Sequence, residues 1–341
     1  ILIGIGMKNV KIRFKLNFIY EPHTSTTTKF ILNFPQIPKI KYTKPPIKWL
    51  GGKTQLLERI MPYFPKEIDN YHELFLGGSS VLLAVLDLVE KGYIKIKGNI
   101  YAYDFNEILI GFFDNIKTHS DGLYTEIQSL KNIYTNLSGT IINRKPDNEE
   151  EATTSKESYY YWCRKQFNQI ENKQSIKSSA LFLFLNKTCF RGVYRTGPNG
   201  FNVPYGHYKT TPTFIEEAYL NNLKKLIDKV QFKCLDFKEA FKNIGDGDFV
   251  YLDPPYAPEN ATSFVGYNKK GFKLEEHQKL FELTKNLDSK NARFIMSNSE
   301  VELVTDAFRD YKIKTFEAKR AINSKKPQSK TNEVIIHNLP L

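Results

Sequence analysis

The stretch of greatest chemical interest is DPPY, which directly follows the apolar run FVYL. Asp253 is expected to end a buried strand, and Pro254 and Pro255 then fix the backbone and have no N–H to donate. What remains is a rigid set of hydrogen-bond acceptors, the Asp253 carboxylate and the Pro254 carbonyl, beside the ring of Tyr256. The alternative interpretation is a strand that merely stops at a proline turn, because Asp-Pro often initiates turns.

This set of groups suits a flat ring that carries an exocyclic amino group. The two acceptors can hold the N–H hydrogens while Tyr256 stacks on the ring. An aromatic amine is a poor nucleophile because its lone pair is delocalised into the ring, and holding both hydrogens draws the nitrogen towards tetrahedral geometry. We therefore favour group transfer to an aromatic amine, with Asp253 as an ionised acceptor, over a simple turn.

A glycine pair and a second acid indicate a cofactor site. Gly77 and Gly78, in HELFLGGSS, stand where a strand is expected to turn into a helix, which permits close approach of a ligand. Asp104 ends the next expected strand, where a carboxylate can accept both hydroxyls of a ribose. Because open α/β sheets bind ligands at the carboxyl ends of their strands, we expect a nucleoside-bearing cofactor and an amine acceptor to share one crevice.

Two further stretches leave alternatives open. KWLGGKTQLL is similar to the end of a phosphate-binding loop, but Ile47 stands where that pattern needs glycine, and the bulky Trp49 does not help amides surround a phosphate. FRGVYRTGPNGFNVPYGHYK interleaves basic and aromatic residues on a hairpin whose turn is 197–200. Arginine on such a ribbon can bind guanine in the major groove of DNA, although an ordinary solvated hairpin explains the stretch equally well.

The composition sets outer bounds on the function. The 341 residues carry a formal net charge of +12, which favours a polyanionic partner, either nucleic acid or an acidic membrane face, although an unspecialised basic enzyme would show it too. Cys163, Cys189 and Cys234 have no metal-ligand spacing, which argues against a disulfide framework and a zinc site. No apolar run approaches a membrane span, so we expect a soluble, intracellular protein without bound metal.

The elements that would position these residues alternate between strands and helices. YHELF, the glycine turn, a helix over 81–92 and the strand NIYAY, followed by a helix over 106–116, predict half of a doubly wound nucleotide-binding sheet. A helix is expected over 54–61, with Thr54 as its N-cap and its end near Pro62.

The middle of the chain interrupts this alternation. Helical segments are expected over roughly 120–190, and the charged stretch 143–156 is expected to be looped or disordered. A helix near 214–229 follows, with strands at VQFKCL, DFVYLD and RFIMSN and a closing antiparallel pair at YKIKTFEAKR and NEVIIHN. The pattern indicates one sheet domain with an insertion.

In this order the motifs resemble those of the Dam-like DNA adenine-N6 methyltransferases. The resemblance rests on KWLGGK, ELFLGGSS, YAYDFN, LFLNKTCFRGVYRTGPNGFNVPYGHY, DPPYAPENATSFVGY and NEVII, and it covers about residues 45–338. DPPY is shared with other amino-group methyltransferases, whereas the FNVPYG hairpin joined to WLGGK is more specific to this family. Leu74, Ser79 and Arg191 depart from the family's usual residues. Because Arg191 lies in the recognition element, the DNA sequence that family members recognise cannot be carried over to this chain.

The resemblance implies an α/β fold, a doubly wound Rossmann-like methyltransferase sheet with an inserted helical and β-hairpin DNA-recognition domain. The catalytic domain would comprise 45–118 and 211–341, and the recognition domain 119–210. The N-terminal arm, 1–44, receives no role.

The resemblance also implies S-adenosylmethionine as the cofactor and double-stranded DNA as the partner. Trp49 would face the sulfonium cation, and Lys53 the cofactor's carboxylate. The residues expected to bind the cofactor are Trp49, Gly51, Gly52, Lys53, Glu73, Phe75, Gly77, Gly78, Asp104, Asp236 and Asp253. The residues expected to hold the target adenine after it is flipped from the duplex are Asp253, Pro254, Pro255 and Tyr256. The residues expected to contact DNA are Phe190, Arg191, Tyr194, Arg195, Asn202 and Pro204.

The sequence thus predicts a site-specific DNA methyltransferase that acts on adenine N6 by base flipping and direct in-line transfer. Phe190 would fill the gap left in the stack, and Arg195 would read a guanine. The alternatives are transfer to cytosine N4 or to RNA, a nucleotide hydrolase that uses GGKT, and a catalytically silent DNA-binding protein. A cognate restriction endonuclease that acts on the same site is a further expected partner.

Overall fold

The computed structural model describes residues 40–258, 272–319 and 330–340, and from Tyr42 onward these belong to one compact unit. Residues 1–39 of the N-terminal arm lie outside the described residues. So does the end of the motif that begins with DPPY, from Glu259 onward.

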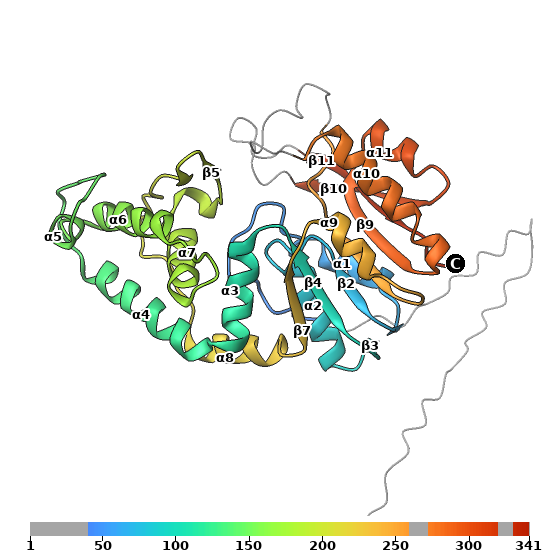
Figure 1. Cartoon of the computed structure of the whole chain (residues 1–341), viewed down its shortest axis with the longest axis horizontal. Coiled ribbons are helices and arrows are strands. Elements are labelled where there is room, and N and C mark those ends of the chain that lie inside the picture. Colours follow the sequence, from blue (N-terminus) through green and yellow to red (C-terminus); the bar gives the residue numbers. More distant parts are fainter. Residues whose placement is uncertain (1–39, 259–271, 320–329, 341) are drawn as a thin grey trace, which may run out of the picture. The chain divides into compact units, whose positions relative to one another are not determined.

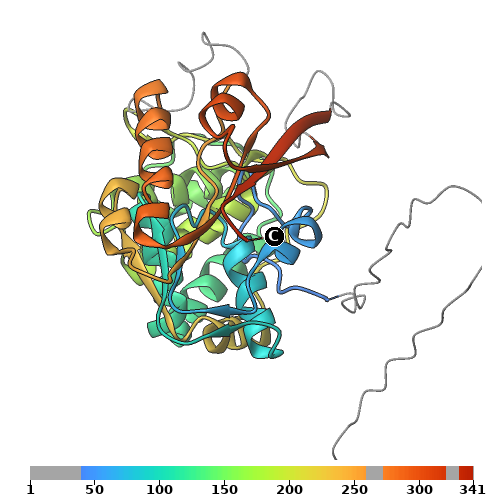
Figure 2. The same ribbon diagram turned by 90° about the vertical axis from the view of Figure 1, so that its right-hand side faces the viewer.

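Within the described ranges, a central sheet of seven strands has the order β10-β11-β9-β8-β2-β4-β7 (Figures 1 and 2). The strands are β2 Tyr71–Glu73, β4 Ile100–Asp104, β7 Val230–Cys234, β8 Phe249–Leu252, β9 Arg293–Ser299, β10 Lys312–Lys319 and β11 Lys330–His337. Strands β7, β4, β2, β8 and β9 run parallel to one another. Strands β11 and β10 complete the sheet with antiparallel pairing. The predicted parallel strands and closing pair are therefore confirmed.

The register of the central strands brings the acids to one edge of the sheet. Glu73, the last residue of β2, lies opposite Ala102 of β4 and Tyr251 of β8. Asp104 and Asp253 each follow these partners by two residues, so all three acids lie at the carboxyl ends of adjacent parallel strands. Every residue of β2 and β8 is buried, as expected for parallel strands that helices cover on both faces.

The helices are α1 Leu57–Ile60, α2 Ser80–Glu90, α3 Glu107–Thr118, α4 Ser120–Asn136, α5 Glu149–Ala152, α6 Lys156–Gln169, α7 Ile176–Thr188, α8 Glu217–Leu226, α9 Phe237–Ala240, α10 Leu274–Lys285 and α11 Glu302–Ala307. The helices predicted over 81–92, 106–116 and 214–229 begin within three residues of their expected starts, as α2, α3 and α8. The start of α3 shows the local cause, because the Asn106 side chain accepts hydrogen bonds from the backbone of Ile108 and Leu109. The apolar face of helix α3 is buried.

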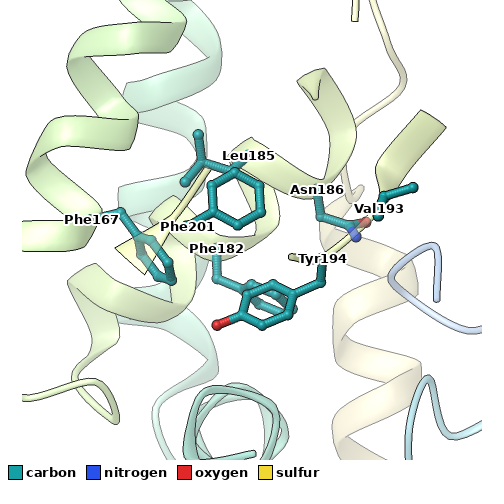
Figure 3. A pocket seen from close by; sticks show the side chains of 7 residues that line it. All are labelled: Phe167, Phe182, Leu185, Asn186, Val193, Tyr194 and Phe201. Carbon is teal, nitrogen blue, oxygen red and sulfur yellow. The ribbon is translucent and has the colours of Figure 1, made fainter. Parts of the chain in front are cut away.

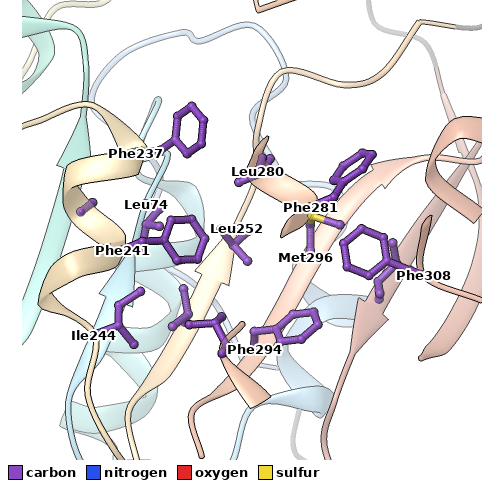
Figure 4. Close-up of a cluster of buried hydrophobic side chains, with 14 of the residues drawn as sticks. Leu74, Phe237, Phe241, Ile244, Leu252, Leu280, Phe281, Phe294, Met296 and Phe308 are labelled. Atoms are coloured by element: carbon purple, nitrogen blue, oxygen red, sulfur yellow. The ribbon is translucent and has the colours of Figure 1, made fainter. Parts of the chain in front are cut away.

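One large apolar cluster fixes α9, α10 and α11 against β8 and β9 (Figure 4). Leu252 and Met296 project from the two strands, and Phe241, Leu280 and Phe308 cover them. All of these side chains are buried, so this cluster holds the end of β8 in place before the chain enters DPPY.

The segment between α3 and α8 is mainly helical. Helix α7 packs against α3, α4 and α6, which Figure 1 shows in green and blue-green. The short strands β5 Thr196–Gly197 and β6 Gly200–Phe201 pair in antiparallel fashion, which confirms the predicted hairpin and its turn. Phe182 and Leu185 of α7 pack with Phe167 and with residues of the hairpin, as Figure 3 shows.

Two local predictions need correction. Within the charged stretch 143–156, residues 143–148 are looped as predicted, but α5 follows with Asn148 as its cap, and the guanidinium of Arg144 lies 2.7 Å from a carboxylate oxygen of Glu157 on α6. Helix α1 does not begin at Thr54, since its N-cap is Leu56. The preceding residues instead form a turn whose backbone is held by other groups, described below.

Candidate active site at the carboxyl ends of the parallel strands

The KWLGGK segment meets DPPY through Lys53. Its ammonium lies 2.7 Å from Asp253 Oδ1, donates a hydrogen bond of 2.7 Å to the carbonyl of Gly51, and lies 4.7 Å from the centre of the Tyr256 ring. Its backbone N–H donates to Ser80 Oγ at the start of α2. Lys53 is therefore buried where the KWLGGK, HELFLGGSS and DPPY motifs meet.

Asp253 is held in a partly dehydrated position with one close cation. Its side chain is 18% exposed, and burial raises the pKa of its carboxyl. Lys53 acts in the opposite direction and lowers that pKa, while the negative charge of Glu333 raises it. The carboxylate is thus stabilised by Lys53, and its oxygens are the acceptors that the sequence predicts for an amine.

Glu73 differs from the other two acids because it faces inward. It is 2% exposed and accepts a hydrogen bond of 2.7 Å from the hydroxyl of Tyr71. Burial raises the pKa of Glu73 to about 8, and the charge of Asp253 adds to the effect. Glu73 therefore keeps its proton at neutral pH and lies beneath the site rather than at its surface.

Asp104 is tied directly to the glycine turn. Its Oδ2 accepts a hydrogen bond of 2.9 Å from the backbone of Gly77, and its Oδ1 accepts one of 2.9 Å from Asn106. Burial raises the pKa of Asp104, and these N–H groups counteract the rise. The expected proximity of Gly77 and Asp104 is thus present in the structure.

The glycine pair makes room for Trp49. A Cβ atom on Gly78 would lie 2.7 Å from the Cβ of Trp49, and one on Gly77 would lie 3.0 Å from its Cδ1. Gly77 also has a φ of +49°, a left-handed conformation that favours glycine. The sequence predicts these glycines for the approach of a ligand, and in the structure their immediate neighbour is the indole.

An open cavity lies beside this contact. It has a volume of about 230 Å³ and is lined by Pro45, Ile47, Lys48, Trp49, Gly52, Thr54, Gly78 and Ser80. The exposed backbone of Gly51 is also uncrowded, since nothing lies within 4 Å of an added Cβ there. The KWLGGK turn therefore leaves space on the side where a cofactor is expected.

The remaining predicted cofactor residues lie further along the same strand ends. Asp236 follows β7 and caps α9 by accepting a hydrogen bond of 2.9 Å from the backbone of Lys238. Phe75 follows β2, and its ring centre lies 5.8 Å from that of Phe237. These residues border the strand ends from the α9 side.

Among the predicted DNA contacts, Tyr194 is the one whose side chain is turned inward. It stacks on Trp49 with ring centres 5.6 Å apart, and it also lies against Phe182 and Phe201 (Figure 3). No space for a water molecule remains among these rings. Tyr194 therefore packs the hairpin against KWLGGK.

The other predicted DNA contacts have exposed side chains. Phe190 is 47% exposed, and the guanidinium of Arg191 lies 5.2 Å from the centre of its ring. Arg195 donates a hydrogen bond of 2.7 Å from Nε to Asn202 Oδ1. The carbonyl of the exposed Pro204 accepts a hydrogen bond of 2.9 Å from the backbone of Phe190.

Asn186 is a residue that the sequence analysis missed. Its side chain pairs with the backbone of Lys48, accepting one hydrogen bond of 2.9 Å and donating one of 2.7 Å, and it donates another of 3.1 Å to the Gly192 carbonyl. It is 3% exposed. This one amide connects α7, KWLGGK and the hairpin. Asn186 lies in LFLNKTCF, one of the stretches on which the family resemblance rests, and that position was the signal that could have identified it.

Comparison with known proteins identifies the family. The family model of D12 class N6 adenine-specific DNA methyltransferases matches residues 49–322. The chain belongs to this family. It is accordingly an adenine-specific DNA methyltransferase, and transfer to cytosine or RNA, nucleotide hydrolysis and a silent DNA-binding role are disfavoured.

Curated relatives agree with this assignment. The type II methyltransferase M.MjaIII of Methanocaldococcus jannaschii is 36% identical over 306 residues, which cover 86% of this chain and 99% of the relative. M1.LlaDCHI of Lactococcus lactis, also a type II methyltransferase, is 30% identical and covers 90% of this chain and 99% of its own length. A DNA adenine methylase of Haemophilus influenzae is 30% identical, with coverages of 84% and 90%.

In 40–258, 272–319 and 330–340, no helix has the length and apolar character needed to cross a membrane. Across those same ranges, no group of three or more His, Cys, Asp or Glu side chains could hold a metal ion.

We predict that Gly78→Ala displaces Trp49 and destabilises the protein by about 1–3 kcal/mol, because the added methyl group overlaps the indole. Thermal or urea unfolding measures this effect. Gly122→Ala is the matched control, since its added Cβ would lie 3.5 Å from Ile176, an ordinary contact. Equal stabilities of the two variants would contradict the prediction.

Proposed function

We propose that the chain transfers the methyl group of S-adenosylmethionine to N6 of an adenine that is flipped out of double-stranded DNA. The single observation that carries this proposal is the convergence of Lys53, Asp253 and Tyr256 at the strand ends. There a carboxylate and an aromatic ring lie side by side in a partly dehydrated setting, as an aromatic amine requires.

The residues around Asp104 fit the parts of the proposed cofactor. Asp104 is a partly exposed residue at the end of β4, and its carboxylate would accept the hydroxyls of a ribose. Trp49 lines the cavity, so its indole would lie beside a sulfonium cation bound there. When bound, S-adenosylmethionine supplies an electrophilic methyl group. Lys53, Gly51, Gly52, Phe75, Gly77, Gly78 and Asp236 would complete the binding site, with Glu73 supporting it from below.

The DPPY residues would act on the acceptor. Asp253 and the carbonyl of Pro254 would accept the two N–H hydrogens of the target amine, which localises its lone pair on nitrogen. Pro255 lacks an N–H and keeps the loop rigid. Tyr256 would stack on the extruded base, which an enzyme must remove from the duplex to reach N6.

We further propose that residues 119–210 form an inserted DNA-recognition domain and that 45–118 and 211–341 form the catalytic domain. The packing of α4, α6 and α7 on one another supports this division. The exposed side chains of Phe190, Arg191, Arg195, Asn202 and Pro204 would contact DNA, while Tyr194 would hold the hairpin in position.

The type II names of two relatives support a proposal about biological context. The enzyme would protect DNA from a restriction endonuclease that cuts the same site. Sequencing that detects methylated adenine, applied to DNA incubated with the enzyme, gives the modified base and the site together. Modification of cytosine alone, or no modification, would overturn the proposed function.

Asp253→Asn is predicted to abolish methylation, because the neutral amide presents only one acceptor and lacks the charge that Lys53 stabilises. The affinity for sinefungin, an analogue of S-adenosylmethionine that cannot donate a methyl group, should remain within a few-fold of the wild type, a difference of about 1 kcal/mol or less. Calorimetry measures this affinity. Asp306→Asn, an exposed substitution on α11, is the control and should retain full activity. Residual turnover above a tenth of the wild-type rate would argue against the role of Asp253.

Activity should fall at acidic pH, because Asp253 must be ionised and burial raises the pKa of its carboxyl. Lys53 lowers that pKa, so Lys53→Met should move the acid limb of the kcat profile to higher pH. Lys53→Arg keeps the charge and should show a smaller displacement. Profiles are measured at saturating cofactor, and an unmoved limb in Lys53→Met would contradict the prediction.

Arg195→Ala should relax the choice of base at one position of the target, with a loss of about 1–3 kcal/mol of discrimination. Asn202 accepts a hydrogen bond from the Arg195 Nε, so Asn202→Ala should produce a weaker form of the same change. Methylation of a randomised DNA library followed by sequencing measures both. Lys225→Ala, an exposed substitution on α8, should leave the pattern unchanged.

A further inference from the structure

The DPPY loop is held by side chains from two strands that the proposed mechanism does not use. Its Tyr256 hydroxyl donates a hydrogen bond of 2.7 Å to Glu333 Oε2. The backbone of the next residue, Ala257, donates a hydrogen bond of 3.1 Å to Asn298 Oδ1 and accepts one from Ser299 Oγ. The ring and the backbone of this loop are thus fixed by separate partners.

Glu333 itself is well anchored. It lies in β11, between β9 and β10, where its backbone is in register with Ser299 on one side and Phe316 on the other. This pairing fixes the backbone of Glu333 on both sides, so the sheet limits where its carboxylate can reach. The bond to Tyr256 then selects one of those positions.

The hydrogen bond has a direct consequence for the ring. A tyrosine on a loop can rotate about two side-chain torsions, whereas a bond at its hydroxyl restricts both. Hydrogen bonds to an ionised acceptor are about twice as strong as neutral ones. Lys53 lies over one side of the ring, 4.7 Å from its centre, so the plane of Tyr256 is defined by a cation and by a carboxylate.

We infer that Glu333 is a positioning residue for methyl transfer, which holds the Tyr256 ring in the plane on which the target adenine stacks. The inference rests on the proposed role of DPPY. It gives a function to the closing NEVII motif, which the mechanism above leaves without one. Glu333 need not touch the base or the cofactor to act in this way.

A double-mutant cycle tests this inference. Tyr256→Phe removes the hydroxyl, and Glu333→Ala removes its acceptor together with the charge that opposes ionisation of Asp253. At a pH well above the acid limb, each should lower kcat about 10–100-fold, the worth of one hydrogen bond to a charged group. The double variant should be no slower than the slower single variant. Glu333→Gln should recover most of the rate, because its amide oxygen can accept the same bond, and KM for S-adenosylmethionine should not change.

Glu300 provides the matched control. Its carboxylate bonds to Thr315 and Asn332 in the same antiparallel strands but not to Tyr256. Glu300→Ala should therefore affect thermal stability without interacting kinetically with Tyr256→Phe. Unfolding midpoints and sinefungin binding of all variants show that they are folded.

Two results would overturn the inference. The first is a double variant whose loss is the product of the two single losses, which means that the residues act independently. The second is a Glu333→Gln variant as slow as Glu333→Ala. Activity that survives Asp253→Asn would instead defeat the proposed role of DPPY, whereas an inactive Asp253→Asn with an additive cycle defeats only the inference about Glu333.

Discussion

The close contact between Trp49 and Gly78 is the constraint on which the rest of the site depends. No side chain fits between them, so the KWLGGK turn lies directly against the start of α2. From this position Lys53 reaches Asp253, and the Trp49 ring stacks on Tyr194 of the hairpin. One indole therefore connects the glycine turn with the hairpin, and the amide of Asn186 repeats the connection through the backbone.

Charge is distributed unevenly at the strand ends. Asp253 lies within electrostatic reach of both Glu73 and Glu333, and Lys53 is the cation paired with it. The inward position of Glu73 reduces repulsion, because its raised pKa leaves it protonated at neutral pH. The charge of Glu333 acts against ionisation of Asp253, which makes Lys53 more important for keeping that carboxylate charged. Repulsion among these acids is therefore limited, because each of them is either protonated or paired with another group.

Much of this was predictable from local patterns, and the exceptions share a cause. Strands, the glycine turn and the hairpin were predicted because apolar runs and turn residues are short-range signals. The convergence of Asp104 and Asp253 followed from a general rule about parallel sheets. The inward turn of Tyr194, the bridging by Asn186 and the bond from Tyr256 to Glu333 depend on which distant segments become neighbours. The stretch 143–156 was partly misread because its charges pair with α6, a partner that composition does not reveal.

The bridge made by Asn186 also bears on how target specificity can change during evolution. Helices α3 and α8, which precede and follow residues 119–210, pack against each other, so the proposed recognition domain would start and end at one place on the proposed catalytic domain. The exposed residues Arg195 and Asn202 of the hairpin can change without disturbing the fold, unlike the buried Phe201 between them. Asn186 and Tyr194 cannot, because they also hold the KWLGGK turn. A chimaera that takes its hairpin from a relative should therefore be joined after Tyr194. The contacts of Asn186 and Tyr194 with the KWLGGK turn are then kept, and only the residues beyond them are exchanged.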